Sequence, residues 1–92
     1  MLDGQDGVNK KIFKMSEGKC RICGDSDYAL LDVHRIQEGA DGGKYIKSNC
    51  VVLCCKCHRK VHDNQIKIYG YYLCSNGKYL LHIEKDDVEL FL

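Results

Sequence analysis

Two pairs of cysteines constrain this chain more than any other feature of its sequence. Cys20 and Cys23 form one CxxC pair, Cys54 and Cys57 form a second, and 30 residues separate the two pairs. Each CxxC turn can present two sulfurs to one ion, so two such turns complete a tetrahedral site for zinc. The sequence therefore predicts a structural zinc site made of these four thiolates.

Cys55 leaves an alternative ligand set open. It could replace Cys54, although a pair made of Cys55 and Cys57 has a less common spacing for a zinc knuckle. We therefore expect Cys54 to be the ligand and Cys55 to be a helix residue. Cys50 and Cys74 have no partner by spacing, and we expect both to be buried structural thiols.

The length of the chain agrees with a metal site. A protein of 92 residues is one small domain that needs a further source of stability, either disulfides or a metal. Seven cysteines are an odd number, which argues against a purely disulfide-bonded framework. The sequence shows neither a secretory signal nor an apolar stretch that could span a membrane. We therefore expect a cytoplasmic, intracellular protein with reduced thiols and no membrane partner.

The remaining patterns predict an α+β fold with a ββα core. Residues 1–9 are expected to be a flexible N-terminal segment, and residues 10–63 to form the zinc-bearing domain. Within it we expect one short turn at 10–19, strands at 28–36 and 50–53, a loop at 37–48 and a helix at 54–62. Residues 64–92 are expected to be a β-hairpin extension of the same domain. Its strands flank Asn76-Gly77, for which we expect a type I′ turn, and 88–92 is a candidate last strand.

Three histidines indicate a second metal site. His58 and His62 are four residues apart in the predicted helix, so they lie on one face, at a spacing typical of metal chelation. Taken alone, such a pair is more often two solvated side chains on an amphipathic helix. His34 lies near the end of the first strand, which can bring it to the same face. Asp32 shares a strand face with His34, where we expect its carboxylate to orient the imidazole.

The segments LDVHRI at 31–36 and LCCKCHRKVH at 53–62, together with Asn49, resemble the HNH nuclease family. The motif of this family is a histidine, an asparagine and a histidine on a ββα-metal hairpin. The resemblance covers residues 20–62 and implies that His34, His58 and His62 bind a catalytic divalent ion, such as Mg²⁺, Mn²⁺, Ni²⁺ or Zn²⁺. It also implies that Asn49 braces the loop between the two strands.

Arg35 departs from the pattern of the family. In many members the residue after the first histidine ligand is also a histidine and acts as the general base. An arginine side chain stays protonated and is a poor base at neutral pH. Arg35 could instead hold a phosphate and stabilise its charge.

The resemblance implies a divalent-metal-dependent endonuclease that hydrolyses DNA phosphodiester bonds. One alternative is a catalytically impaired HNH-fold module that binds nucleic acid, with Arg35 on a phosphate; RNA or a nucleoprotein complex would be an alternative partner. Another is a zinc-knuckle adaptor whose tyrosine-rich hairpin binds protein. Net charge does not decide among these functions, because the basic excess is small: residues 1–60 hold 11 lysines and arginines against 8 acidic residues. Phage or mobile-element origin is common in this family.

Overall fold

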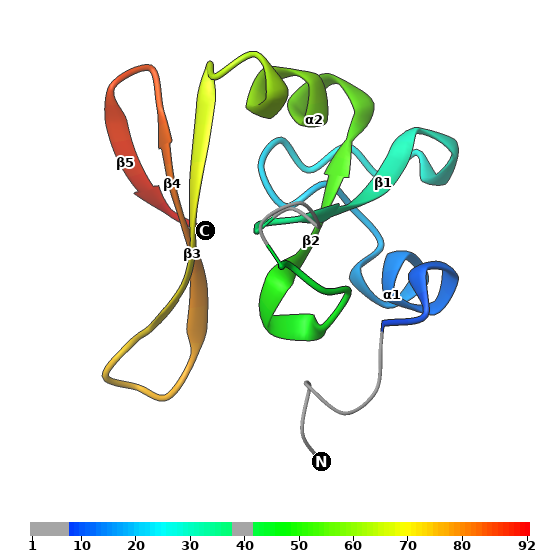
Figure 1. Cartoon of the computed structure of the whole chain (residues 1–92), viewed down its shortest axis with the longest axis horizontal. Coiled ribbons are helices and arrows are strands. Elements are labelled where there is room, and N and C mark those ends of the chain that lie inside the picture. The colour runs from blue at the N-terminus through cyan, green and yellow to red at the C-terminus, as the bar shows by residue number, and fades with distance from the viewer. Residues whose placement is uncertain (1–7, 38–41) are drawn as a thin grey trace.

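The computed structural model of the chain describes residues 8–37 and 42–92 and has an α+β architecture (Figure 1). In chain order, the elements are α1 (Lys10–Glu17), the 3-10 helix η1 (Tyr28–Leu30), β1 (Leu31–Arg35), the 3-10 helix η3 (Lys47–Asn49), β2 (Cys50–Cys54), α2 (Cys55–His62), β3 (Ile66–Leu73), β4 (Tyr79–Lys85) and β5 (Val88–Phe91).

The centre of the molecule is a ββα unit, as the sequence predicts. Strands β1 and β2 pair antiparallel, with Leu31 opposite Cys54 and Arg35 opposite Cys50. Helix α2 follows β2 directly, and Cys54 is its N-cap, with a sulfur that accepts a hydrogen bond from the Cys57 backbone. The first strand begins later than predicted, since residues 28–30 form η1. The reason is a local cap, because the Asp27 side chain accepts a hydrogen bond from the backbone of Ala29.

Helix α1 precedes this unit and is longer than the single turn we expected. The Asn9 side chain caps its first turn by accepting from the Ile12 backbone, and Gly18 ends it in the left-handed conformation, with φ of 71°. None of its residues is buried, and Phe13 packs against the core from a partly buried position. Residues 1–7 of the predicted N-terminal segment lie outside the described residues.

The C-terminal residues form a three-stranded antiparallel sheet in the order β3-β4-β5. The prediction of a type I′ turn at Asn76-Gly77 is wrong, because that turn needs a positive φ at both residues and only Gly77 has one. The connection is a three-residue loop closed by a hydrogen bond from the Cys74 backbone to the Lys78 carbonyl. Both residues of the turn between β4 and β5, Asp86 and Asp87, have positive φ.

The ββα unit and the C-terminal sheet share one hydrophobic core. Its largest fully buried side chains come from both parts of the chain, and they are Leu31, Leu53, Ile66, Leu81, Ile83, Val51 and Val52. Figure 1 shows the sheet standing beside the ββα unit, with α2 leading into β3. Of the two cysteines expected to be buried, Cys50 is fully buried and Cys74 is half-buried.

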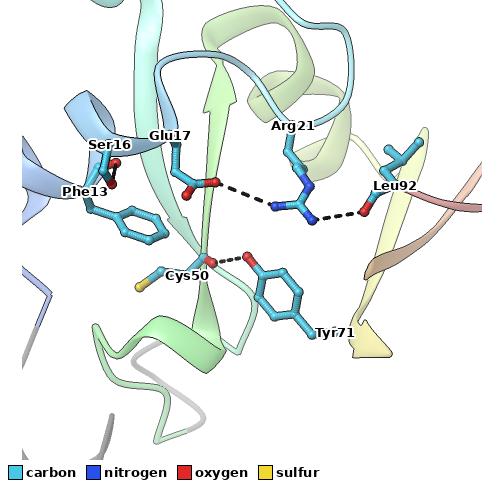
Figure 2. Close-up of polar contacts among 7 residues, drawn as sticks. All are labelled: Phe13, Ser16, Glu17, Arg21, Cys50, Tyr71 and Leu92. Carbon is cyan, nitrogen blue, oxygen red and sulfur yellow. Dashed lines mark hydrogen bonds and ion pairs between the residues drawn. The ribbon is translucent and has the colours of Figure 1, made fainter. Parts of the chain in front are cut away.

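Polar contacts also join the sheet to the rest of the protein (Figure 2). The Arg21 guanidinium donates to the Leu92 carbonyl at 3.0 Å and lies 3.6 Å from the Glu17 carboxylate of α1. The Tyr71 hydroxyl of β3 donates to the Cys50 carbonyl of β2 at 2.7 Å. The sheet is therefore tied to both α1 and the ββα unit. None of the helices in the described ranges is long and apolar enough to cross a membrane.

Candidate metal centres

Four sulfurs gather where the loop before β1 meets the start of α2. The Sγ atoms of Cys20, Cys23, Cys54 and Cys57 all lie within 4.8 Å of one another, and all of these residues except Cys23 are buried. A tetrahedral zinc ion with bonds of about 2.3 Å places its sulfurs about 3.8 Å apart, so the cluster fits such an ion. Cys55 is exposed and lies outside the cluster. Of the two alternatives left by the sequence, the structure thus places Cys54 beside the other three.

Backbone amides support negative charge on this cluster. The Cys23 amide lies 3.5 Å from the Cys20 sulfur, and the Cys57 amide lies 3.4 Å from the Cys54 sulfur. Burial raises the pKa of Cys20, but backbone hydrogen bonds outweigh it and bring that pKa to about 7. Burial and the neighbouring sulfurs raise the pKa of Cys57. Four crowded thiols therefore compete for negative charge, and a divalent cation is the kind of group that allows all four to be thiolates.

A separate cluster contains three histidines. One ring nitrogen each of His34, His58 and His62 lies within 4.8 Å of the others. Strand β1 carries His34, which is buried, and α2 carries the other two, whose Nε2 atoms are 3.1 Å apart. Imidazole nitrogens bound to one zinc ion at about 2.0–2.1 Å would be separated by about 3.4 Å, so the cluster also fits an ion.

The environment of His34 keeps its imidazole neutral. Burial, followed by the charges of His58, His62 and Arg35, lowers its pKa to about 4. A neutral imidazole offers a lone pair to a metal, whereas a protonated one does not. His34 is therefore in the metal-binding state at neutral pH.

Asp32 acts on a different histidine from the one we expected. Its Oδ2 lies 3.5 Å from Nδ1 of His58, rather than beside the neighbouring His34. Helix α2 contacts β1, so a side chain on β1 can reach a histidine on the helix. A carboxylate at Nδ1 fixes the orientation of the ring and leaves Nε2 free for a metal.

Asn49 holds the loop between β1 and β2. Its side chain accepts a hydrogen bond from the Gln37 backbone at 2.7 Å and donates to the carbonyls of Gln37 and Lys44 at 3.0 and 2.9 Å. One amide thus joins the beginning and the end of the loop. This fixes the end of β1, which carries His34 and Arg35.

The histidines open into a pocket of about 200 Å³ that Val33, Arg35 and Tyr45 also line. Arg35 therefore lies at the site, and its guanidinium carbon is 4.4 Å from the centre of the Tyr45 ring. Tyr45 was not among the site residues predicted from the sequence. The available signal was an aromatic residue in a polar, glycine-rich loop, close to the asparagine that braces this loop.

Comparison with known proteins agrees with this geometry. A type IV methyl-directed restriction enzyme, EcoKMcrA of Escherichia coli (strain K12), is 34% identical over 62 residues, which cover 60% of this chain. The match spans 22% of the length of that enzyme. No solved structure matches the chain. The HNH endonuclease family model matches residues 20–64, a range that holds both metal-ligand clusters. This part of the chain therefore belongs to the HNH endonuclease family.

Proposed function

We propose that the protein is a divalent-metal-dependent endonuclease that hydrolyses DNA phosphodiester bonds. The observation that carries the proposal is the meeting of three histidines and Arg35 in one pocket, apart from the four-cysteine cluster. A metal-ligand set and a fixed cation at one site suit a phosphate diester, which is an anion. The membership of residues 20–64 in the HNH family supports this choice of chemistry.

The two clusters have different tasks in this proposal. Cys20, Cys23, Cys54 and Cys57 hold a structural Zn²⁺, which contributes to the folding free energy. His34, His58 and His62 hold the catalytic divalent ion. An ion held by these three imidazoles would supply Lewis-acid chemistry, polarising a phosphoryl oxygen and stabilising charge on the leaving oxygen. A set of three imidazoles suits Zn²⁺ or Ni²⁺ better than Mg²⁺, which prefers carboxylate oxygens and water.

The side chains of the pocket then act on the substrate and on one another. Arg35 binds the scissile phosphate and stabilises its negative charge. Asp32 orients His58, and Asn49 holds the loop that places Arg35. Because Arg35 stays protonated, the proton of the attacking water must go to another group.

The position of Arg35 also supports one alternative. A histidine general base contributes about 10²–10⁴-fold to a rate, and this chain carries a cation at the corresponding place. The second candidate function is therefore an HNH-fold module that binds nucleic acid without cutting it.

Conversion of supercoiled plasmid to nicked circles distinguishes the two functions. Purified protein is incubated with Mg²⁺, Mn²⁺, Ni²⁺ or Zn²⁺ in separate reactions, with a metal-depleted buffer as the control. We expect nicking that depends on added metal, and Arg35→His should raise its rate by up to about 10²–10⁴-fold. Retention of plasmid without nicking by any metal would favour the binding module. A labelled single-stranded RNA in the same reactions tests the alternative substrate.

A further inference from the structure

Two cations from different segments share one aromatic ring beside the histidine pocket. The Lys10 ammonium nitrogen lies 4.1 Å from the centre of the Tyr45 ring, and the Arg35 guanidinium carbon lies 4.4 Å from it. Lys10 begins α1, Arg35 ends β1, and Tyr45 lies in the loop between β1 and β2. Helix α1 precedes the residues that match the HNH family. The fold thus brings a lysine from outside the family segment to the edge of the pocket.

No carboxylate balances these two charges among the described residues. The ion pairs found there involve Arg21, His58 and His82. The ring face of Tyr45 attracts a cation, but this attraction is weaker than pairing with an anion. Nearby, the pKa of the buried Cys50 thiol is raised by burial and lowered by the charges of Arg35 and Lys10. Positive charge is therefore concentrated at one place, and no carboxylate of residues 8–37 or 42–92 pairs with it.

Helix stability does not explain why a lysine occupies the first position of α1. Acidic residues are favourable in the first turn of a helix, and α1 has none there. Instead it begins with Lys10 and Lys11. The approach of Lys10 to Tyr45 is fixed by the backbone, because the Val8 amide donates to the Tyr45 carbonyl. Lys10 is thus held near the ring despite an unfavourable position in its helix.

We propose that Lys10, Tyr45 and Arg35 form an extended phosphate-binding site for the nucleic acid backbone, in which Lys10 binds the phosphate next to the scissile phosphate that Arg35 binds. The ring positions the two cations, and a phosphate oxygen supplies an anion for them to pair with. Arg35 and Tyr45 line the pocket together with the histidines, and Lys10 extends the positive surface from there onto α1. Such contacts set the register of the substrate and carry no sequence information. The inference takes from the proposed function only that the ligand is nucleic acid. It does not require that the protein cleaves this ligand.

The test is the salt dependence of binding to a fluorescein-labelled 20-base-pair DNA duplex, followed by fluorescence anisotropy. All variants carry His58→Ala, so that no cleavage occurs during the titration. Loss of one phosphate contact lowers the magnitude of the slope of log affinity against log salt by about 0.9. At 0.1 M salt this corresponds to binding that is about eightfold weaker. We expect this change for Lys10→Ala. The matched control is Lys11→Ala, since Lys11 is the exposed neighbour in the same helix turn.

Two variants of Tyr45 test the role of the ring. Tyr45→Phe keeps the ring and should bind as the parent protein does, whereas Tyr45→Leu should lose affinity as Lys10→Ala does. Circular dichroism and zinc content establish that each variant is folded. Equal affinities and equal slopes for Lys10→Ala and Lys11→Ala would overturn the site, as would a parent protein that does not bind the duplex.

The outcomes separate this site from the proposed enzyme. Suppose that Lys10→Ala has a reduced slope and that the wild-type protein fails to nick plasmid with each of the metals tested. This result would keep the phosphate site and reject the nuclease. Nicking by the wild type, together with an unchanged slope for Lys10→Ala, would keep the nuclease and reject the phosphate site.

Discussion

Replacing Tyr71 with phenylalanine removes one hydroxyl from the contact between the C-terminal sheet and the ββα unit (Figure 2). This hydroxyl donates to the carbonyl of Cys50, a fully buried residue, at 2.7 Å. Removing one partner of such a bond costs about 1–2 kcal/mol, because the carbonyl loses a donor that water cannot readily replace. In a domain of this size, 1 kcal/mol corresponds to about 4–8 °C in Tm. We expect Tyr71→Phe to lower Tm by about 5–15 °C in one cooperative transition.

Thermal unfolding followed by circular dichroism measures this effect. The control is Tyr72→Phe, because Tyr72 is exposed and, in the part of the chain that the structure describes, its hydroxyl makes no hydrogen bond. That variant should melt within about 2 °C of the wild type, since surface changes rarely exceed about 0.5 kcal/mol. Equal losses in the two variants would refute the reasoning. A separate early transition of the wild type would also refute our proposal that residues 64–92 extend the same domain.

Tyr71 should also make the stability of the protein depend on pH. Burial raises the pKa of Tyr71 to about 12, with the Arg21 charge opposing and the Glu17 and Cys50 charges adding to the shift. An unfolded tyrosine titrates near pH 10. The unfolded state therefore releases its proton first as the pH rises, so this contribution is complete below pH 10 and is lost between about pH 10 and 12. Tm of the wild type should fall more steeply over this interval than Tm of Tyr71→Phe, and parallel curves would contradict the assignment.

Three further predictions concern the zinc ligands, the hairpin and the pocket. Cys54→Ser should abolish stoichiometric zinc and unfold the domain, while Cys55→Ser should keep about one structural zinc per chain by elemental analysis; the reverse result would show that Cys55 is the ligand. Gly77→Val should cost roughly 1–2 kcal/mol, because Gly77 has a positive φ of 84°, and an unchanged Tm would argue against that conformation. Arg35→Ala should weaken both duplex binding and any nicking, whereas unchanged binding would exclude a phosphate contact at residue 35.

The features that the sequence predicted correctly are set by short spacings. A CxxC turn brings its two sulfurs together whatever the rest of the chain does, and His58 and His62 share a face in any α-helix. His34 can join these two histidines only if its strand pairs with the strand that leads into the helix. The pairing of β1 with β2 meets this requirement. This is why the proximity of the four cysteines, and of the three histidines, could be predicted before their geometry was known.

The features that the sequence missed depend on contacts between distant segments. Tyr45 becomes part of the pocket only because its ring lies beside Arg35 at the end of β1, and Asn49 holds the neighbouring Lys44 through its carbonyl. Lys10 reaches the same ring because α1 packs beside the ββα unit. Which of the two histidines Asp32 contacts depends on how α2 lies over β1. Spacing along the chain carries no information on any of these three arrangements.

His58→Ala shows whether the histidine cluster and the four-cysteine cluster are separate metal centres. Plasmid nicking and zinc content are measured on the same preparation, beside a His82→Ala control, since His82 lies in the C-terminal sheet and contacts Glu89 instead. We predict that His58→Ala loses nicking, keeps its fold and retains about one zinc per chain, while His82→Ala nicks as the wild type does. Loss of the structural zinc and of the fold in His58→Ala would contradict this separation, and nicking by His58→Ala at the wild-type rate would contradict the catalytic role of the histidine cluster.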